Sequence, residues 1–303
     1  MRDEKKTKRL GFLPMGLLLL LAAVILGTIL LTPYDLPGTT PPNTYMNLAN
    51  GGFVAENGSM LYYVSGKGVL YCRSGANTYR IDEGADSLCP YGSGIVYRLQ
   101  GGRVVYSDYR GEEKKEVLSG VQQMVVGGNW VFYTRADGVL HKRSLLTGEE
   151  KDLGLRVKQY LIAATSVLYT DPDGYLFTAR TDGSGVEPFL AQPVDSFARF
   201  ESNVFYTREG VLYAVAAGNT ASKHTYFPVK AYNVTSEGIL FFTDEEGLHT
   251  YDLTDEKAKI RDVTASGGVT DRLCAWDARL CYYNEEGTLL CCLKDGTEAL
   301  YLQ

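Results

Sequence analysis

The sequence predicts an all-β protein, a seven-bladed β-propeller that follows one N-terminal transmembrane helix. Three observations lead to this prediction. A basic cluster at the N-terminus precedes a long uncharged apolar run. The rest of the 303-residue chain repeats one strand–turn–strand pattern at nearly constant spacing. The repeated part is rich in tyrosine (22) and glycine (33), and it shows no helical periodicity, so we expect strands throughout it.

The N-terminal segment divides into a basic tail, an apolar run and a linker. Residues 1–9 hold five basic side chains, and residues 10–31 hold no charged side chain at all. As a helix, 22 residues extend about 33 Å, enough to cross a hydrocarbon core of about 30 Å. The basic tail favours the cytoplasmic side, which predicts an extracytoplasmic position for everything that follows. Residues 32–44 are rich in proline and threonine, so we expect them to form a stiff stalk, and we expect residues 45–303 to form the propeller.

A cleaved secretory signal is the alternative for residues 10–31. Such a signal has an apolar region of about 7–15 residues that ends at a site of small residues. The run in this chain is longer and ends in GTILLTPYD, and its first cysteine is Cys72, far beyond the position a lipoprotein signal requires. We therefore expect an uncleaved signal anchor in a cell membrane, with the lipid bilayer as a partner of this helix. Both alternatives export the rest of the chain.

Charge limits the partners of the exported part. The whole chain carries a net charge of −6, and residues 1–10 hold five basic against two acidic side chains, which leaves −9 for the remainder. An acidic domain repels nucleic acid and anionic lipid surfaces. We expect no nucleic-acid partner.

A β-hairpin pattern recurs seven times after residue 45. It reads MLYYVSGKGVLY in the first copy and SVLYTDPDGYLF in the fourth. Apolar and polar residues alternate around a glycine-containing turn, as in a hairpin, and most copies add a second turn and a preceding apolar segment. One unit is therefore about four short strands. The aromatic residues shared by the copies are Tyr63, Tyr97, Tyr133, Tyr169, Tyr206, Phe242 and Tyr283.

Radial packing is the arrangement that lets such units cover one another. The shared aromatic residues are 34 to 41 positions apart, and seven copies predict seven blades, with six as the fallback. A solenoid fits less well, because its repeats are shorter and lack two hairpin turns. We expect each shared aromatic to pack between blades with its hydroxyl bonded at a blade edge. The 41-residue spacing before Tyr283 predicts a longer loop near residues 258–268.

The copies YTDPDGYLFTARTDGSG and VFYTREGVLYAV resemble blades of the low-density-lipoprotein-receptor type, whose signature is Tyr-Trp-Thr-Asp. The opening NLANGGFVAENGSMLYYVS is similar to bacterial membrane-anchored propeller domains of unknown function that are related to that module. The resemblance covers about residues 45–303 and departs from the receptor motif, because Phe-Tyr-Thr or Leu-Tyr-Thr stands in place of the tryptophan motif. It implies a propeller used for binding, and it carries no catalytic residues with it.

Motifs for catalysis or metal binding are not evident in the sequence. The acidic turns at 171–174, 244–247 and 284–287 do not match the ligand spacing of calcium loops, so ordinary hairpin turns explain them better. His141, His224 and His249 show no zinc spacing, and no phosphate-binding loop or nucleophile elbow is present. We expect no catalytic, cofactor-binding or metal-binding residues, no cofactor and no enzymatic activity.

Four of the six cysteines fall in the seventh repeat. A two-residue turn between Cys274 and Cys281 would place them directly opposite each other on neighbouring strands, on one face of the sheet. We expect these two side chains to lie in contact. Whether they form a disulfide or stay small buried hydrophobes is left open.

The function predicted from these features is non-catalytic binding of an envelope protein or peptide at a propeller face. Loops on a rigid scaffold serve recognition, and a propeller gathers its loops at two rims. One alternative is a lectin-like module for cell-wall glycan, which exposed aromatic clusters on one rim would favour. The other is a propeller hydrolase, which carboxylates converging on the channel mouth would favour.

Overall fold

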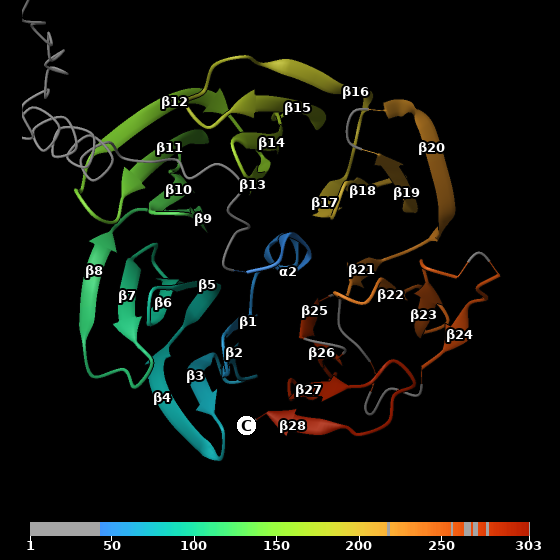
Figure 1. Cartoon of the computed structure of the whole chain (residues 1–303), viewed down its shortest axis with the longest axis horizontal. Coiled ribbons are helices and arrows are strands. Elements are labelled where there is room, and N and C mark those ends of the chain that lie inside the picture. The colour runs from blue at the N-terminus through green and yellow to red at the C-terminus, as the bar shows by residue number, and fades with distance from the viewer. Residues whose placement is uncertain are drawn as a thin grey trace, which may run out of the picture. The chain divides into compact units, whose positions relative to one another are not determined.

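The computed structural model describes residues 43–216, 219–255, 257–263, 268, 272–276 and 279–302, without the side chains of 219–225. Their strands form seven four-stranded sheets around a central axis (Figure 1). The predicted seven-bladed propeller is confirmed, and the six-bladed fallback is wrong. The predicted tail, membrane helix and all but the last two residues of the stalk lie outside the described residues. No helix in the described part of the chain has the length and apolar character needed to cross a membrane.

Each blade is made of four strands that are consecutive in the chain. Blades 1 and 2 contain β1 (Val54–Asn57), β2 (Met60–Val64), β3 (Val69–Ser74), β4 (Asn77–Glu83), β5 (Ala85–Tyr91), β6 (Gly94–Leu99), β7 (Val104–Asp108) and β8 (Lys114–Leu118). Blades 3 and 4 contain β9 (Gln123–Gly127), β10 (Trp130–Thr134), β11 (Val139–Ser144), β12 (Glu150–Arg156), β13 (Gln159–Ala163), β14 (Ser166–Thr170), β15 (Tyr175–Arg180) and β16 (Glu187–Pro193). Blades 5 and 6 contain β17 (Ser196–Phe200), β18 (Asn203–Arg208), β19 (Val211–Ala216), β20 (Asn219–Pro228), β21 (Ala231–Val234), β22 (Ile239–Thr243), β23 (Leu248–Asp252) and β24 (Arg261–Asp262). Blade 7 contains β25 (Leu273–Trp276), β26 (Arg279–Tyr283), β27 (Leu289–Cys292) and β28 (Leu300–Leu302).

The turns within each blade contain the glycines at which the repeat predicted them. In blade 4, Gly174 donates its N–H to the carbonyl of Asp171 at 3.0 Å and has a φ of +87°, a conformation that favours glycine. The predicted second turns also lie between the third and fourth strands of their blades. Their glycines all have positive φ; they are Gly75, Gly111, Gly148, Gly183 and Gly296.

The hydrophobic core is divided among the spaces between blades. The second strands are almost fully buried, and β10 and β22 are buried along their whole length. The fourth strands, such as β12, alternate between exposed and buried residues. The largest buried cluster spans blades 7, 1 and 2, and separate clusters fill the spaces between other neighbouring blades. Each sheet therefore buries both faces against its neighbours, as radial packing requires.

A short helix, α2 (Tyr45–Ala49), lies in the centre of the ring and is surrounded by the first strands of the blades (Figure 1). We expected only strands in the propeller, so this helix corrects the prediction. Thr44 caps its N-terminus, because the Thr44 hydroxyl accepts the N–H of Asn47 at 3.0 Å. Met46 is 1% exposed and packs in the cluster between blades 5 and 6. Burial against several blades stabilises a helix that is too short to persist alone.

Six of the seven shared aromatics occupy the predicted equivalent positions. Each is the fourth residue of the second strand of its blade. In blade 7 that position belongs to Tyr282, which pairs with Leu273 and is 1% exposed, so the assignment to Tyr283 is wrong by one residue. Because Tyr282 and Tyr283 are adjacent, either of them could be aligned with the shared aromatic of the other repeats. The loop predicted near residues 258–268 contains the short strand β24, and residues 264–267 lie outside the described residues.

The cysteines of blade 7 form a row across three strands. Cys274 is the register partner of Cys281, and Cys281 is in turn the partner of Cys291, so the predicted opposition of the first two is confirmed. The candidate disulfide between them is wrong: Cys281 is bonded to Cys291, and Cys274 is a free thiol. Cys281 on β26 has a cysteine opposite it on both neighbouring strands, β25 and β27. The prediction considered only the β25–β26 hairpin. Burial raises the pKa of Cys274 to about 12, which keeps this thiol protonated.

Candidate functional site

The channel at the centre of the propeller is occupied by the protein's own helix α2. Asn47 donates from Nδ2 to the carbonyl of Ala275 at 2.7 Å and accepts the N–H of Ala275 at 2.8 Å. Asn233 donates to the Oδ1 of Asn47 at 3.1 Å, and Asn50 donates to the carbonyl of Tyr232 at 2.9 Å. These bonds tie α2 to the first strands of blades 6 and 7. The helix at the centre of the ring favours the loops and grooves around it as binding surfaces.

The candidate site is a pocket of about 670 Å³ formed by loops of blades 7, 1 and 2, which we call the Arg98 pocket. Its walls are the β2–β3 turn, the β4–β5 connection, the β6–β7 turn and the β26–β27 turn. These loops lie at one end of their strands, next to Gly51 at the C-terminal end of α2. The pocket therefore forms where the first and last blades of the ring meet.

Two arginines bring positive charge to the pocket. Arg98 donates from Nε and Nη2 to the two carboxylate oxygens of Asp86 at 2.9 and 2.6 Å, a bidentate pair that fixes the guanidinium. Arg272 is exposed, and no hydrogen bond or ion pair to it is present among the described residues. One arginine is thus fixed by a carboxylate, and the other has an exposed side chain.

Backbone forms much of the rest of the lining. Five glycines line the pocket, and the absence of side chains there lets a ligand approach the main chain closely. They are Gly51, Gly66, Gly68, Gly84 and Gly287. Ser87 also lines it and has a φ of +53°, which is uncommon for a residue with a side chain. Backbone in unusual conformations is typical of binding sites.

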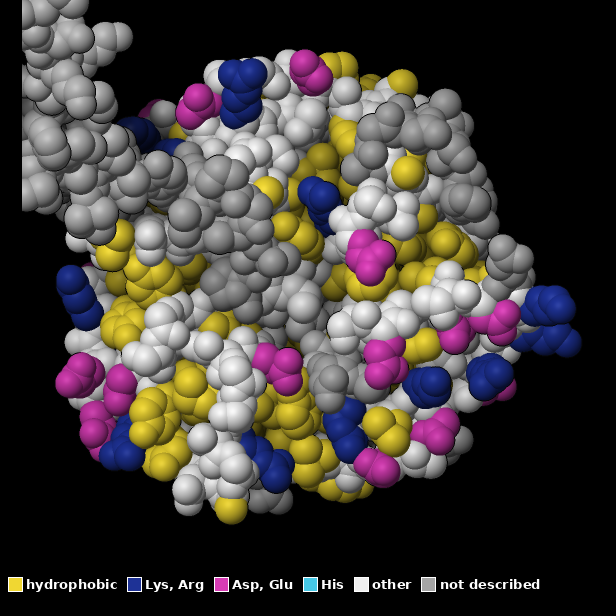
Figure 2. All heavy atoms as spheres, in the orientation of Figure 1, with side chains coloured by type: hydrophobic (Ala, Val, Ile, Leu, Met, Phe, Trp, Pro, Cys, Tyr) yellow, Lys and Arg dark blue, Asp and Glu magenta, His cyan; other side chains and the backbone are white. Residues whose placement is uncertain are grey.

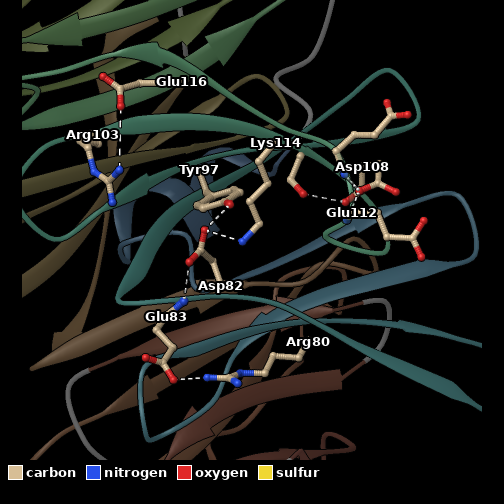
Figure 3. Close-up of polar contacts among 11 residues, drawn as sticks. Arg80, Asp82, Glu83, Tyr97, Arg103, Asp108, Glu112, Lys114 and Glu116 are labelled. Atoms are coloured by element: carbon tan, nitrogen blue, oxygen red, sulfur yellow. Dashed lines mark hydrogen bonds and ion pairs between the residues drawn. The ribbon is translucent and has the colours of Figure 1, made fainter.

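A polar network joins blade 1 to blade 2 (Figure 3). Asp82 of β4 accepts the hydroxyl of Tyr97 at 2.8 Å and the ammonium of Lys114 at 3.0 Å. Tyr97 precedes Arg98 on β6, so the network fixes the strand that carries the pocket arginine. Burial opposes ionisation of Asp82, but the bonds from Tyr97 and Lys114 outweigh it and lower the pKa of this carboxyl.

Two further grooves lie between blades. The groove between blades 2 and 3, about 500 Å³, is lined by Tyr91, Tyr106 and Leu145 beside the 70% exposed Leu146. The groove between blades 5 and 6, about 470 Å³, combines Phe205 and Tyr226 with polar groups. Figure 2 shows basic and acidic side chains interspersed on one face, with apolar side chains visible between the blades over β1–β8. That face carries no broad patch of one charge.

The aromatic residues predicted from the repeat lie outside the Arg98 pocket, apart from Tyr283. Tyr283 lines the pocket and donates its hydroxyl to the carbonyl of Val64 at 2.7 Å, which joins blade 7 to blade 1. Tyr97 and Tyr133 donate their hydroxyls to the carboxylates of Asp82 and Glu150 on fourth strands. Cys274 and Cys281 are fully buried and do not line the Arg98 pocket.

The charged residues of the Arg98 pocket could not be selected from the sequence. Arg98, Asp86 and Arg272 belong to no motif, and Arg272 is 174 positions from Arg98 in the chain. One signal was available: Asp86 and Arg98 are register partners in the β5–β6 hairpin, so an acidic and a basic residue face each other there. The approach of Arg272 depends on closure of the ring.

Comparisons with known proteins support the fold. No protein-family model matches the chain, and no curated protein matches it. Among solved structures it is similar to the tricorn protease (TM-score 0.59, 11% identity), covering 87% of this chain and 34% of that chain. It is similar to the computationally designed Ika8 protein (TM-score 0.55, 13% identity, 86% and 89% covered). It is also similar to BamB from Moraxella catarrhalis (TM-score 0.51, 13% identity, 82% and 87% covered).

At identities of 11% to 13%, these likenesses establish the propeller fold and nothing finer. This chain spans about a third of the tricorn protease chain that it matches. The low-density-lipoprotein-receptor type and the bacterial membrane anchor stay predictions.

Proposed function

We propose that the propeller is a non-catalytic binding module that takes a protein or peptide segment bearing a carboxylate in the Arg98 pocket. The observation that carries this proposal is the presence of two arginines in one pocket built from the loops of three blades. Arg98 is fixed by Asp86, and Arg272 is exposed and has no ion pair among the described residues. Guanidinium groups are suited to carboxylates because they offer parallel N–H donors. A side chain or C-terminus of a peptide fits this chemistry.

The occupied channel and the pocket size support a peptide. Because α2 lies in the centre of the ring, the loops around it are the favoured surface, and a pocket of about 670 Å³ accommodates a few residues of a peptide. The glycines of the lining leave backbone groups accessible for main-chain hydrogen bonds. A partner protein would present such a segment as a loop or a tail.

The test is selection of peptides from a random display library on the full-length chain, with Arg272→Ala as the variant. Wild type is expected to enrich peptides with an acidic residue or a free C-terminus at a fixed position, and the variant is expected to lose that enrichment. Arg261→Ala is the matched control, because Arg261 is also exposed but lies on the outer strand of blade 6. Equal enrichment by wild type and Arg272→Ala would refute the proposal.

A glycan ligand is the second candidate, favoured by the groove between blades 5 and 6. Phe200, Phe205 and Tyr226 line this groove together with Glu201 and Glu237. Aromatic rings stack on sugar faces while carboxylates accept sugar hydroxyls. A glycan panel probed with wild type and Tyr226→Ala tests it, and binding that the substitution leaves unchanged would exclude this groove. The propeller hydrolase stays a prediction.

We also propose that residues 10–31 anchor this module in a bacterial cell membrane with the propeller outside. The long uncharged run and the basic tail support this topology. N-terminal sequencing of the membrane fraction is expected to find a start at Met1 or Arg2, and protease added to intact cells is expected to digest the propeller. A start between residues 27 and 44 would exclude the uncleaved anchor.

A further inference from the structure

Blade 6 carries a second pocket, of about 530 Å³, that is polar and acidic. His249 lies at its base, 5% exposed, with each ring nitrogen against a different carboxylate. Nε2 is 2.9 Å from Oδ1 of Asp244, and Nδ1 is 3.0 Å from Oδ1 of Asp262. One oxygen of each carboxylate therefore faces a ring nitrogen of His249. The other oxygen, Oδ2, of either carboxylate has no hydrogen bond within the described part of the chain.

A buried hydroxyl in the same pocket also lacks a partner. Thr243 is 5% exposed and lines the pocket, and its Oγ1 has no hydrogen bond among the described residues. In blade 5 the equivalent Thr207 is paired with Ser196, with 2.8 Å between the two hydroxyls. In blade 6 the register partner of Thr243 is Ala231, which removes that bond. A buried polar atom without a partner costs stability, and a ligand would satisfy it.

Negative charge dominates around these groups. Asp244, Glu246 and Asp262 line the pocket, and the one lysine in the lining, Lys230, is paired with Glu245 at 3.0 Å. Burial opposes ionisation of Asp244, but the backbone N–H of Glu246 and the ring of His249 outweigh it and lower the pKa of this carboxyl. Asp244 is therefore ionised at neutral pH.

We propose that this pocket binds a primary ammonium or guanidinium group, with Asp244 and Asp262 supplying the charge and Thr243 accepting a hydrogen bond. Such a cation brings several N–H donors and no acceptor, and the pocket offers unused acceptors. A metal ion is not the ligand that these residues favour, because the described residues contain no group of three or more side chains able to hold one. The cation comes from a lysine or arginine side chain of a partner protein or from a free amine.

This pocket and the Arg98 pocket share no lining residue, so each proposal stands or fails by itself. Blade 4 offers a matched comparison within the chain. The corresponding residues there are Thr170, Asp171 and Phe177, with Phe177 in place of the histidine. Blade 4 thus has the same turn as blade 6, but it has no imidazole there that contacts a second carboxylate.

The test is calorimetric titration of the full-length chain at low salt with four probes. These are N-acetyl-lysine methylamide, N-acetyl-arginine methylamide, the uncharged norleucine analogue and butylamine. We expect the cationic probes to bind and the norleucine analogue not to bind. Tighter binding of the two amino-acid amides than of butylamine indicates a side chain of a partner protein, and equal binding indicates a free amine.

Three variants decide whether the binding uses this pocket. Asp262→Asn changes an exposed side chain and is expected to weaken binding about fivefold. Thr243→Val keeps the volume and is expected to weaken it also, whereas Asp171→Asn in blade 4 is expected to leave it unchanged. Equal binding of the lysine and norleucine probes, or unchanged binding by Asp262→Asn, would overturn the proposal.

Discussion

A Cβ placed on Gly66 would lie 1.3 Å from the carbonyl oxygen of Gly287. Gly66 belongs to the β2–β3 turn of blade 1 and Gly287 to the β26–β27 turn of blade 7, so the two turns touch where the ring closes. Phe53 and Tyr283 add a ring contact between the same blades, with centroids 4.8 Å apart. Closure depends on close packing and on the hydrogen bond from Tyr283 to Val64, because no strand is shared between the two blades.

Gly66→Ala is expected to destabilise the propeller by about 3 kcal/mol, because the added methyl overlaps backbone that cannot move without opening the ring. Denaturant unfolding followed by tyrosine fluorescence measures the change. Gly58→Ala is the control: it has a φ of +61° but open space around a Cβ, so it reports backbone strain alone. Gly66 itself has no positive φ, so a stability of Gly66→Ala equal to that of wild type would show that the contact with Gly287 does not limit closure.

Tyr97→Phe is expected to cost about 2 kcal/mol at neutral pH, because it removes a hydrogen bond to a charged acceptor, Asp82. The pKa of Asp82 is lowered in the folded protein, so this stabilisation is present above about pH 4 and is lost as the pH falls through the folded value. Urea unfolding between pH 7 and pH 3 should show the cost of the substitution shrinking with acid. Tyr169→Phe, whose hydroxyl has no hydrogen bond among the described residues, should cost little at any pH. A pH-independent cost for Tyr97→Phe would contradict the assignment.

Tyr206→Ala is expected to lower the free energy of unfolding by about 3–5 kcal/mol, as for a large deletion in a packed core. Tyr206 is 2% exposed and stacks on Tyr213 with ring centroids 5.2 Å apart. Tyr301, 56% exposed on the outer strand of blade 7, provides the comparison, and Tyr301→Ala should change stability by less than about 0.5 kcal/mol. Thermal unfolding of both variants would settle the difference.

Trypsin separates Cys274 from Cys281 by cleaving after Arg279, whereas Cys281 and Cys291 stay on one peptide. A non-reduced digest of alkylated protein should therefore contain peptide 273–279 alone, with Cys274 as a thiol that alkylates only after unfolding. Further cleavage after Glu285 or Glu286 should leave the two halves of peptide 280–294 joined. Mass spectrometry that finds peptide 273–279 linked to 280–294 would show the Cys274–Cys281 bond instead.

The repeat was sufficient to predict the blades, because alternation and turn glycines are local features. It could not separate Tyr282 from Tyr283, since the distance from aromatic to glycine varies: Gly210 follows Tyr206 by four positions and Gly174 follows Tyr169 by five. The hairpin pairing of Cys274 with Cys281 was likewise local and correct, whereas the bond from Cys281 to Cys291 depends on a choice between two neighbours.

The central helix and the pockets depend on contacts between distant parts of the chain. The segment YMNLA carries no amphipathic pattern long enough to predict a helix, and its stability comes from the strands around it. Asn47 bonds to Ala275, 228 positions away, and no local rule connects the two. Arg98 and His249 come to lie in their pockets only because of the strand register and the closed ring, so the sequence alone could not assign them to a site.

Construction from consecutive strands has a consequence for how the chain folds. Every strand pairing joins neighbours in the sequence, so each blade can form as soon as its roughly 36 residues are free to pair. The steps with long sequence separation are the docking of α2 and the meeting of blade 7 with blade 1. A chain that emerges from its N-terminus would thus assemble six blades as an open arc. Completion of the ring would wait for the last thirty or so residues, and folding kinetics should show this as a late step.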